Sequence, residues 1–289
     1  MRLSARHAPG AQEMTQTRKM EGKRVFVTGS GTGIGRGVAL EFAREGAAVV
    51  LHYAHSADGA ASAVDEIRGA GGKAEAFQAD LADIDEVKGL ADKAIDFLGG
   101  LDVLVNNAGI TMNKPFLDVT PEQFDTLYNV NIRGMYFLTQ AAVPTMIGQG
   151  GGAVINLTSV HAFAGMTEHT IYAGTKAAIV GFTRVLALEL ATKGVRVNAI
   201  APGWILVENH LKVLGEFDQQ EAGATIPAGV IGAPHDIGKL AIYLASDESR
   251  YIVGQTIVID GGMLAIMPLS GDFRDQRQEQ WGQGYVPGV

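Results

Sequence analysis

Short apolar runs alternate along the chain with longer segments in which apolar residues recur at helical spacing. Several of the runs are almost continuous β-formers, which is typical of strands covered on both faces. The predicted strands are Arg24–Thr28, Ala48–Tyr53, Ala74–Ala79, Leu101–Asn106, Ala153–Thr158, Arg196–Ala201 and Thr256–Ile259. The predicted helices include Ile34–Glu45, Asp58–Ala70, Ile84–Leu98, Pro121–Ile147 and Tyr172–Lys193.

This alternation of strand and helix predicts an α/β fold: a Rossmann-type, doubly wound parallel sheet of about seven strands with helices on both faces. Neither an internal repeat nor a linker rich in Pro, Gly or Ser divides the chain, so we expect a single domain over residues 21–267. Residues 1–20 are predicted to be a mobile N-terminal extension. In such sheets ligands bind beyond the carboxyl ends of the strands, and the candidate motifs of this sequence all lie at those ends.

Residues 268–289 are predicted to form an appended C-terminal tail. Trp281 and Tyr285 are aromatic residues in an otherwise polar segment, whereas disordered tails usually lack aromatics. The tail is therefore predicted to pack on a neighbouring subunit, with a frayed end as the alternative.

Composition narrows the classes of partner. Hydrophobic residues make up 47% of the 289 positions and charged residues 19%, which is enough for a sizeable core. A formal net charge of −8 argues against a nucleic-acid partner. The absence of cysteine excludes disulfides and cysteine-ligated zinc, and the sequence shows no other cluster of metal ligands. No apolar run reaches the ~20 residues that span a bilayer, and the first twenty residues lack the apolar middle of a secretory signal, so we expect a cytoplasmic protein that does not bind membranes.

A glycine-rich turn, Thr28–Gly35 (TGSGTGIG), joins the first predicted strand to the first predicted helix. Glycine can adopt positive φ, and its missing Cβ lets a pyrophosphate approach the backbone. The helix that follows presents free N–H groups and the positive end of its dipole to that phosphate. The alternative is a turn without a ligand, and the position between strand and helix makes a dinucleotide site the favoured interpretation.

Tyr172 and Lys176 lie four residues apart, which places them on one face of a helix. A free tyrosine has a pKa near 10, too high for a base that works near neutrality, and a neighbouring cation lowers it. Such a pair alone is usually a surface pair. Ser159, at the end of the fifth predicted strand, and the glycine turn make a catalytic pair the favoured interpretation.

Several motifs in order resemble the short-chain dehydrogenase/reductase family. They are TGxxxGIG at Thr28–Gly35, NNAG at Asn106–Gly109, Asn131, Ser159, YxxxK at Tyr172–Lys176, Pro202-Gly203 and Asp260-Gly261-Gly262. Each motif is weak alone, whereas the set in this order and spacing is highly specific. The resemblance covers roughly residues 23–263.

The resemblance implies an NAD(P)-dependent oxidoreductase that transfers a hydride between nicotinamide and a secondary alcohol or ketone. In the roles it implies, Tyr172 exchanges the proton, and Lys176 lowers the pKa of Tyr172 and holds the nicotinamide ribose. Ser159 hydrogen-bonds the substrate oxygen, and Asn131 positions a water that connects Lys176 to solvent. It also implies a homotetramer, or a homodimer, paired through long helices such as Tyr172–Lys193.

The cofactor is predicted to be NADP(H) or NAD(H). The predicted contacts are Gly29, Ser30, Thr32, Gly33, Ile34, Gly35, Tyr53, His55, Ser56, Asp80, Leu81, Asn107, Ala108, Gly109, Tyr172, Lys176, Pro202, Gly203 and Ile205. The second predicted strand has no acid at its end to repel a 2′-phosphate, which slightly favours NADP(H). His55 and Ser56 are either donors to that phosphate or ordinary loop residues. The family often has a Thr where this chain has Val207, which puts that side-chain bond to the carboxamide in doubt.

The residues predicted to face the substrate are polar: His161, Trp204, Glu208 and His210, with Glu168, His169 and Asn209 nearby. They favour a small hydroxylated substrate such as a sugar or polyol. The main alternative is a carbonyl reductase similar to 3-oxoacyl-[acyl-carrier-protein] reductases, for which an acidic carrier needs a basic dock; Lys193 and Arg196 are the nearest candidates. A more remote alternative is a non-catalytic dinucleotide-binding sensor, which would be expected to have lost Tyr172 or Lys176.

Overall fold

The computed structural model describes residues 18–208 and 217–266. Seven parallel strands form one sheet in the order β3-β2-β1-β4-β5-β6-β7. They are β1 (Arg24–Val27), β2 (Ala48–Tyr53), β3 (Ala74–Gln78), β4 (Val103–Asn106), β5 (Gly152–Leu157), β6 (Val195–Pro202) and β7 (Thr256–Ile259). The predicted α/β class and its seven-stranded parallel sheet are confirmed.

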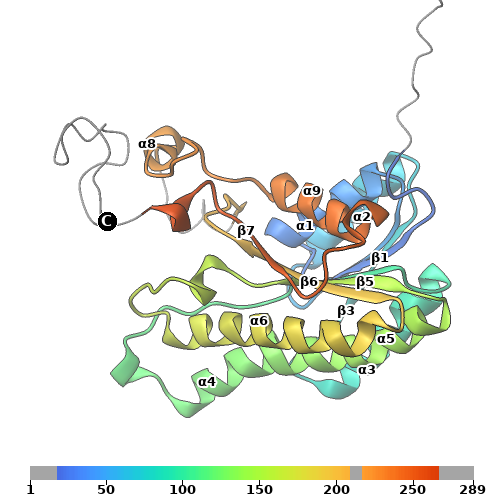
Figure 1. Cartoon of the computed structure of the whole chain (residues 1–289), viewed down its shortest axis with the longest axis horizontal. Helices are drawn as coiled ribbons and strands as arrows, with labels where there is room; N and C mark the ends of the chain where they lie inside the picture. The colour runs from blue at the N-terminus through green and yellow to red at the C-terminus, as the bar shows by residue number, and fades with distance from the viewer. Residues whose placement is uncertain (1–17, 209–216, 267–289) are drawn as a thin grey trace, which may run out of the picture.

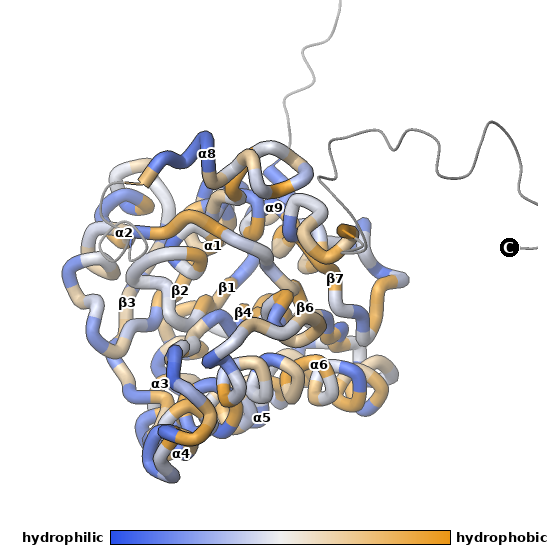
Figure 2. Tube along the Cα trace, turned by 90° about the vertical axis from the view of Figure 1, so that its left-hand side faces the viewer, coloured by the Kyte–Doolittle hydropathy of each residue, from blue (hydrophilic) through white to orange (hydrophobic). Residues whose placement is uncertain are grey.

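Helices cover both faces of the sheet (Figure 1). On one face lie α1 (Gly33–Arg44), α2 (Ala57–Gly69) and α9 (Pro234–Ala245), and on the other lie α3 (Ile84–Leu98), α4 (Pro121–Tyr128), α5 (Met135–Gly148) and α6 (Thr170–Ala191). The short α8 (Gln219–Ala224) lies at the outer edge of the fold and is mostly hydrophilic (Figure 2). Short 3₁₀ turns are η1 (Phe116–Asp118), η3 (Val160–Ala162), η4 (Asp247–Ser249) and η5 (Met263–Ala265).

Alternate residues of each central strand enter different cores. Val25 and Val27 of β1 pack with α1, α2 and α9, whereas Phe26 packs with α3 and α5. Because side chains alternate across a strand, burial of both faces requires an apolar residue at every position. This is the physical reason for the continuous apolar runs in the sequence.

The predicted helix Pro121–Ile147 is interrupted in the structure. A capping box at Thr120 begins α4, in which the Thr120 hydroxyl accepts from the Gln123 N–H and the Gln123 side chain accepts from the Thr120 N–H. A π turn, η2 (Asn129–Gly134), then separates α4 from α5. Such a turn inserts one extra residue into the helical path and is frequent at functional sites. It brings Asn131 toward the loop that follows β4.

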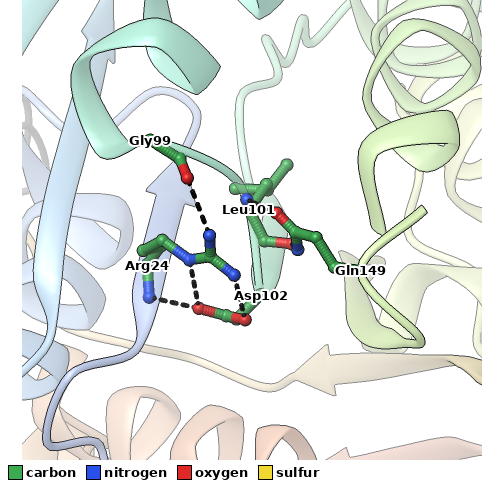
Figure 3. A network of polar contacts seen from close by, with 5 residues as sticks. All are labelled: Arg24, Gly99, Leu101, Asp102 and Gln149. Carbon is green, nitrogen blue, oxygen red and sulfur yellow. Dashed lines mark hydrogen bonds and ion pairs between the residues drawn. The ribbon is translucent and has the colours of Figure 1, made fainter. Parts of the chain in front are cut away.

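At the amino ends of the strands, away from the glycine turn, Arg24 and Asp102 hold β1 to β4. The Arg24 guanidinium donates two hydrogen bonds of 2.8 Å to the two carboxylate oxygens and a third to the Gly99 carbonyl oxygen (Figure 3). Gln149 pairs with the backbone of Leu101 on the far side of the same corner. This bidentate pair fixes register and takes no part in the chemistry discussed below.

The described chain is already packed before the predicted domain start. Met20 is 1% exposed, and its N–H donates to the Glu45 carbonyl oxygen at 2.9 Å. Most of the predicted extension 1–20 and all of the predicted tail 268–289 lie outside the described residues. Within the described part, α6 is long and apolar enough to cross a membrane by length and composition. It lies along the sheet and buries the side that carries Lys176, whereas Val185 and Leu188 on its other side are exposed.

Candidate active site

The glycine turn lies at the carboxyl edge of the sheet, between β1 and α1. Its neighbours β2 and β4 extend the sheet in opposite directions from β1, so the turn is at the topological switch point. Gly29 has φ +61°, and a Cβ there would lie 2.7 Å from the Ala108 Cα. A Cβ on Gly35 would collide with the Gly29 carbonyl oxygen and the Asn107 side chain. The close approach of these backbones therefore requires glycine at both positions.

The turn and the segment after β4 form one hydrogen-bonded unit. The Thr28 hydroxyl oxygen accepts from the backbone N–H groups of Asn107 and Ala108, at 3.0 Å each. The Asn107 side-chain amide donates in return to the carbonyl oxygens of Thr28 (2.9 Å) and Gly29 (3.0 Å). Thr28 and Gly29 of the glycine turn are thus hydrogen-bonded directly to the NNAG motif, so both motifs belong to one site.

A cavity of about 1450 Å³ opens at this edge of the sheet. The predicted cofactor contacts that line it are Gly29, Thr32, Gly33, Ile34, Tyr53, His55, Ser56, Asp80, Leu81, Asn107, Ala108, Gly109, Tyr172, Lys176, Pro202, Gly203 and Ile205. Two other predicted contacts, Ser30 and Gly35, are not in its wall. The Ser30 side chain is fully buried and its hydroxyl donates to the Val27 carbonyl oxygen, so this residue could reach a ligand only through its backbone.

These residues fit a dinucleotide. The cavity runs from the end of β2, past the glycine turn, to Tyr172 on α6. Thr32 precedes α1 without capping it through its side chain, so the hydroxyl of Thr32 does not take up the N–H groups of the first turn of α1, which are the groups that bind anions. Gly33 N–H donates to a Glu208 carboxylate oxygen at 3.0 Å, which shows that this position accepts negative charge.

Tyr172 and Lys176 lie on α6 with the lysine beside the phenol. The Lys176 Nζ is 5.5 Å from the centre of the Tyr172 ring and donates to the Leu157 carbonyl oxygen at 3.0 Å. The Lys176 side chain is 5% exposed, and Ser159, two residues beyond Leu157, is 7% exposed. Tyr172, Lys176 and Ser159 all line the cavity, so the structure brings these three predicted catalytic residues together.

Burial sets the protonation of this group. It lowers the pKa of Lys176 to about 8, so the amine still carries its proton at neutral pH. Burial also raises the pKa of Tyr172, and the hydrogen bond with Ser159 opposes this. In the cofactor-free protein Tyr172 is therefore a neutral phenol beside an ammonium group, and that cation favours the phenolate when the proton leaves.

Asn131 is buried behind the cavity wall and not in it. Its Oδ1 accepts from the Ile110 N–H (2.8 Å), while its Nδ2 donates to the Ile110 carbonyl oxygen (2.9 Å) and the Thr175 hydroxyl (3.1 Å). A Cβ on Gly109 would lie 3.2 Å from this Oδ1 and 3.5 Å from the Lys176 Nζ. The side chain of Asn131 thus holds the loop next to Lys176, and its role toward a water stays a prediction.

Two histidines flank Tyr172 on the predicted substrate side. The His161 and His169 rings stack with centroids 5.0 Å apart and both meet the Tyr172 ring edge-on, at 5.7 and 6.2 Å. Burial and the nearby His169 lower the pKa of His161. Trp204 lines the same cavity and packs on Phe217 with ring centroids 5.8 Å apart.

The other two predicted substrate residues are placed differently. Glu208 binds Gly33 N–H at the glycine turn, so its carboxylate lies where the cofactor phosphate was expected and not beside Tyr172. His210 lies outside the described residues. Val207, which replaces the family's Thr, lines the cavity and lies close to Gly33.

Sequence reasoning missed His52 as a site residue. Its Nδ1 accepts from the Gly29 N–H at 3.0 Å, and its Nε2 lies 3.0 Å from the Ala79 carbonyl oxygen. The one available signal was a lone titratable residue inside an otherwise apolar strand. Across residues 18–208 and 217–266, no three His, Asp or Glu side chains gather as a set of metal ligands.

Comparison with known proteins identifies the family. A family model described as "Enoyl-(Acyl carrier protein) reductase" matches residues 29–264. The chain is 40% identical over 241 residues to the 3-oxoacyl-[acyl-carrier-protein] reductase FabG of Staphylococcus aureus strain Mu50, an alignment that covers 83% of this chain and 98% of that protein. The chain belongs to the short-chain dehydrogenase/reductase family.

Other members of the short-chain dehydrogenase/reductase family are similarly related. The chain is 39% identical over 246 residues to an L-rhamnose 1-dehydrogenase (NAD(P)(+)) from Sphingomonas sp. strain SKA58, covering 84% of this chain and 97% of that protein. A short-chain dehydrogenase from Burkholderia cenocepacia J2315, solved in complex with NADP, matches with a TM-score of 0.76 and 32% identity. That match covers 84% of this chain and 98% of that one. The resemblance predicted from the motifs is confirmed.

Proposed function

We propose that this protein is an NAD(P)-dependent oxidoreductase that interconverts a secondary alcohol and a ketone, with Tyr172 as the group that transfers the proton. The observation that carries the proposal is one cavity lined both by the glycine turn and by Tyr172, Lys176 and Ser159. The related proteins named above are dehydrogenases and reductases, some of them named or solved with a nicotinamide cofactor. The retained tyrosine and lysine speak against a sensor without turnover.

A nicotinamide bound in this cavity would supply or accept the hydride. In the reducing direction the Tyr172 hydroxyl donates its proton to the carbonyl oxygen of the substrate. The Ser159 hydroxyl donates a hydrogen bond to the same oxygen and stabilises the charge that develops there. The Lys176 ammonium stabilises the phenolate that forms, and in the oxidising direction that phenolate accepts the proton of the alcohol.

The Tyr172→Phe variant tests this assignment. General acid–base catalysis contributes about 10²- to 10⁴-fold, so kcat should fall by roughly that factor while the dinucleotide Kd changes less than about twofold. Tyr251→Phe is the control, because Tyr251 is 96% exposed and does not line the cavity. Turnover of Tyr172→Phe at the rate of the unmodified enzyme would remove the proposal.

The preferred cofactor is proposed to be NADP(H). Ala54, His55 and Ser56 line the end of the cavity beyond β2, and the described residues that line the cavity include no acid there that could repel a 2′-phosphate. The ratio of kcat/KM for NADP⁺ and NAD⁺ decides between the two, and a ratio below one would reverse the preference.

The proposed substrate is a small polyhydroxylated alcohol or its ketone. Supporting this, the two imidazoles of His161 and His169 and the indole N–H of Trp204 border the cavity beside Tyr172 and offer hydrogen-bonding groups. The second candidate is a 3-oxoacyl thioester on an acyl carrier, favoured by the 40% identity to FabG. A panel of sugars and polyols against 3-oxoacyl thioesters separates them, since kcat/KM should be highest for the true class.

We also propose that the chain forms homotetramers or homodimers. Val185 and Leu188 on α6 and Tyr136 on α5 are 59%, 76% and 45% exposed, which is typical of a surface that another subunit covers. Residues 21–267 are proposed as the catalytic domain and 268–289 as a tail that docks on a neighbouring subunit. A cytoplasmic location completes the proposal and agrees with the absence of cysteine.

A further inference from the structure

His52 is a buried imidazole that the chemistry above does not use. It lies near the end of β2 with 2% of its surface exposed, in a strand whose other central residues are apolar. A buried polar side chain of this size must satisfy both ring nitrogens. Its two partners, Gly29 and Ala79, lie in two different segments at the dinucleotide cavity.

Both ring nitrogens contact backbone groups. Nδ1 accepts from the Gly29 N–H at 3.0 Å, and Nε2 lies 3.0 Å from the Ala79 carbonyl oxygen. A backbone N–H can only donate and a carbonyl oxygen can only accept. The two contacts therefore require the neutral imidazole with its proton on Nε2.

The backbone of His52 strengthens the connection to the turn. Its carbonyl oxygen accepts from the Ser30 N–H at 2.8 Å, and its N–H donates to the Ser30 hydroxyl at 3.0 Å. Gly29 and Ser30 are thus both fixed to one residue of β2. On the other side, Ala79 directly precedes Asp80 and Leu81, which line the cavity. The imidazole ring therefore connects the glycine turn to the segment that follows β3.

We propose that His52 is a positioning residue for the dinucleotide. Its neutral imidazole holds the Gly29 N–H and the Asp80 segment in the geometry that binds the cofactor, and protonation of the ring releases the turn and weakens binding. The inference rests on the proposed function in that it takes a dinucleotide as the ligand. It adds an acid-sensitive control of affinity that lies outside the catalytic group.

Protonation cannot be accommodated by the geometry. A proton on Nδ1 would face the Gly29 N–H, so that two donors would point at each other and the contact would open. Burial lowers the pKa of His52, opposed by the bond to Ala79 and by the charge of Asp80. The ring is therefore neutral at pH 7, and affinity should be full there and decline as the pH falls below the ordinary range of histidine.

The charged groups around this corner are few among the described residues. Asp80 follows β3, and Glu86 on α3 accepts from the Asp80 N–H at 2.7 Å. His55, in the loop after β2, lines the same cavity. The turn itself contributes Gly29 and Ser30, which do not titrate. A substitution at position 52 leaves Asp80, Glu86 and His55 in place, so any change in the pH dependence of binding is due to the His52 imidazole.

Two substitutions separate the two contacts. His52→Asn places an amide oxygen near the position of Nδ1, so it can still accept from Gly29, and it does not titrate. His52→Gln reaches the position of Nε2, so it can donate to Ala79 but leaves the Gly29 N–H without its acceptor. Circular dichroism of both variants establishes that they fold.

The experiment measures the Kd of NADP⁺ and of NAD⁺ by titration calorimetry from pH 5 to pH 8. The Kd of the unmodified protein is divided by the Kd of His52→Asn at each pH, because this ratio cancels the titration of the ligand's own phosphate. That ratio should rise progressively as the pH falls toward 5. His52→Gln should bind about 5- to 30-fold more weakly at pH 7.5, because a buried donor is left unpaired. In the absence of cofactor, the backbone amides of the segment that contains Gly29 should exchange hydrogen faster in the His52→Gln protein than in the His52→Asn protein.

Each failure has a separate meaning. A ratio that stays flat across the range, or His52→Gln binding as tightly as the unmodified protein, overturns the role of His52 and leaves the proposed function intact. Failure of the unmodified protein to bind either dinucleotide overturns both.

Discussion

The buried ammonium of Lys176 should make the folded protein more stable as the pH rises above neutrality. Burial lowers the pKa of Lys176 from 10.5 to about 8. Between those values the unfolded chain binds more protons than the folded chain, so the free energy of unfolding rises with pH. This is opposite to the trend expected of a lysine that is stabilised by an ion pair.

The magnitude follows from the two pKa values. Each pH unit between them corresponds to about 1.4 kcal/mol, so holding the proton on Lys176 costs the folded state roughly 3 kcal/mol at pH 7. At pH 10 most of that penalty is gone, because the folded state then carries the neutral amine. The free energy of unfolding should gain roughly 2 to 3 kcal/mol from this residue between pH 7 and pH 10.

The assay compares urea unfolding of Tyr172→Phe with that of Tyr172→Phe/Lys176→Met at both pH values, at equal protein concentration and without cofactor. The shared Tyr172→Phe background removes the titration of the phenol. Methionine also removes the bond to the Leu157 carbonyl oxygen, but that loss is the same at every pH and cancels in the comparison. A difference between the two proteins that stays constant within about 0.5 kcal/mol from pH 7 to pH 10 would refute the reasoning.

Two further predictions follow from the geometry. Because the Glu208 carboxylate accepts from the Gly33 N–H, Glu208→Gln should tighten dinucleotide binding about two- to fivefold, which is the effect of one carboxylate at a helix N-terminus. Titration calorimetry measures this change, with Glu221→Gln as the control. Unchanged or weaker binding by Glu208→Gln would contradict the prediction. Leu188→Asp should lower the assembly state in light scattering if the exposed face of α6 pairs with another subunit. Val230→Asp, also at an exposed apolar side chain, should leave the mass unchanged, and an unaltered mass for Leu188→Asp would remove this mode of pairing.

The sheet was predictable because a single physical condition governs its central strands. A strand buried on both faces needs apolar side chains at every position, and that condition is visible in any short window of sequence. The helix path after β4 was less predictable. Within the π turn at Asn129–Gly134, the Asn131 side chain bonds Ile110 and Thr175, which are distant in sequence. Local periodicity carries no record of those contacts.

The candidate site divides in the same way. Tyr172, Lys176 and Ser159 were accessible to sequence reasoning because helix spacing and strand ends place them. The contact of Glu208 with the Gly33 N–H and the whole role of His52 were not, because they depend on which backbone N–H groups the fold brings to these side chains. A side chain that binds a distant backbone group leaves no spacing pattern.

Substitutions in the cavity wall and substitutions that loosen the glycine turn should change different kinetic parameters. Tyr172 and Ser159 reach the reacting atoms from the wall of the cavity, so their loss should lower kcat and leave dinucleotide affinity nearly intact. His52 and Asn107 hold the backbone of the glycine turn, so their loss should raise the dinucleotide Kd while the chemical step of the bound enzyme proceeds. Lys176 belongs to both groups, because its Nζ lies against the Tyr172 ring and against the backbone of β5. Its substitution should therefore change both parameters together, which distinguishes it from every other residue of the site discussed here.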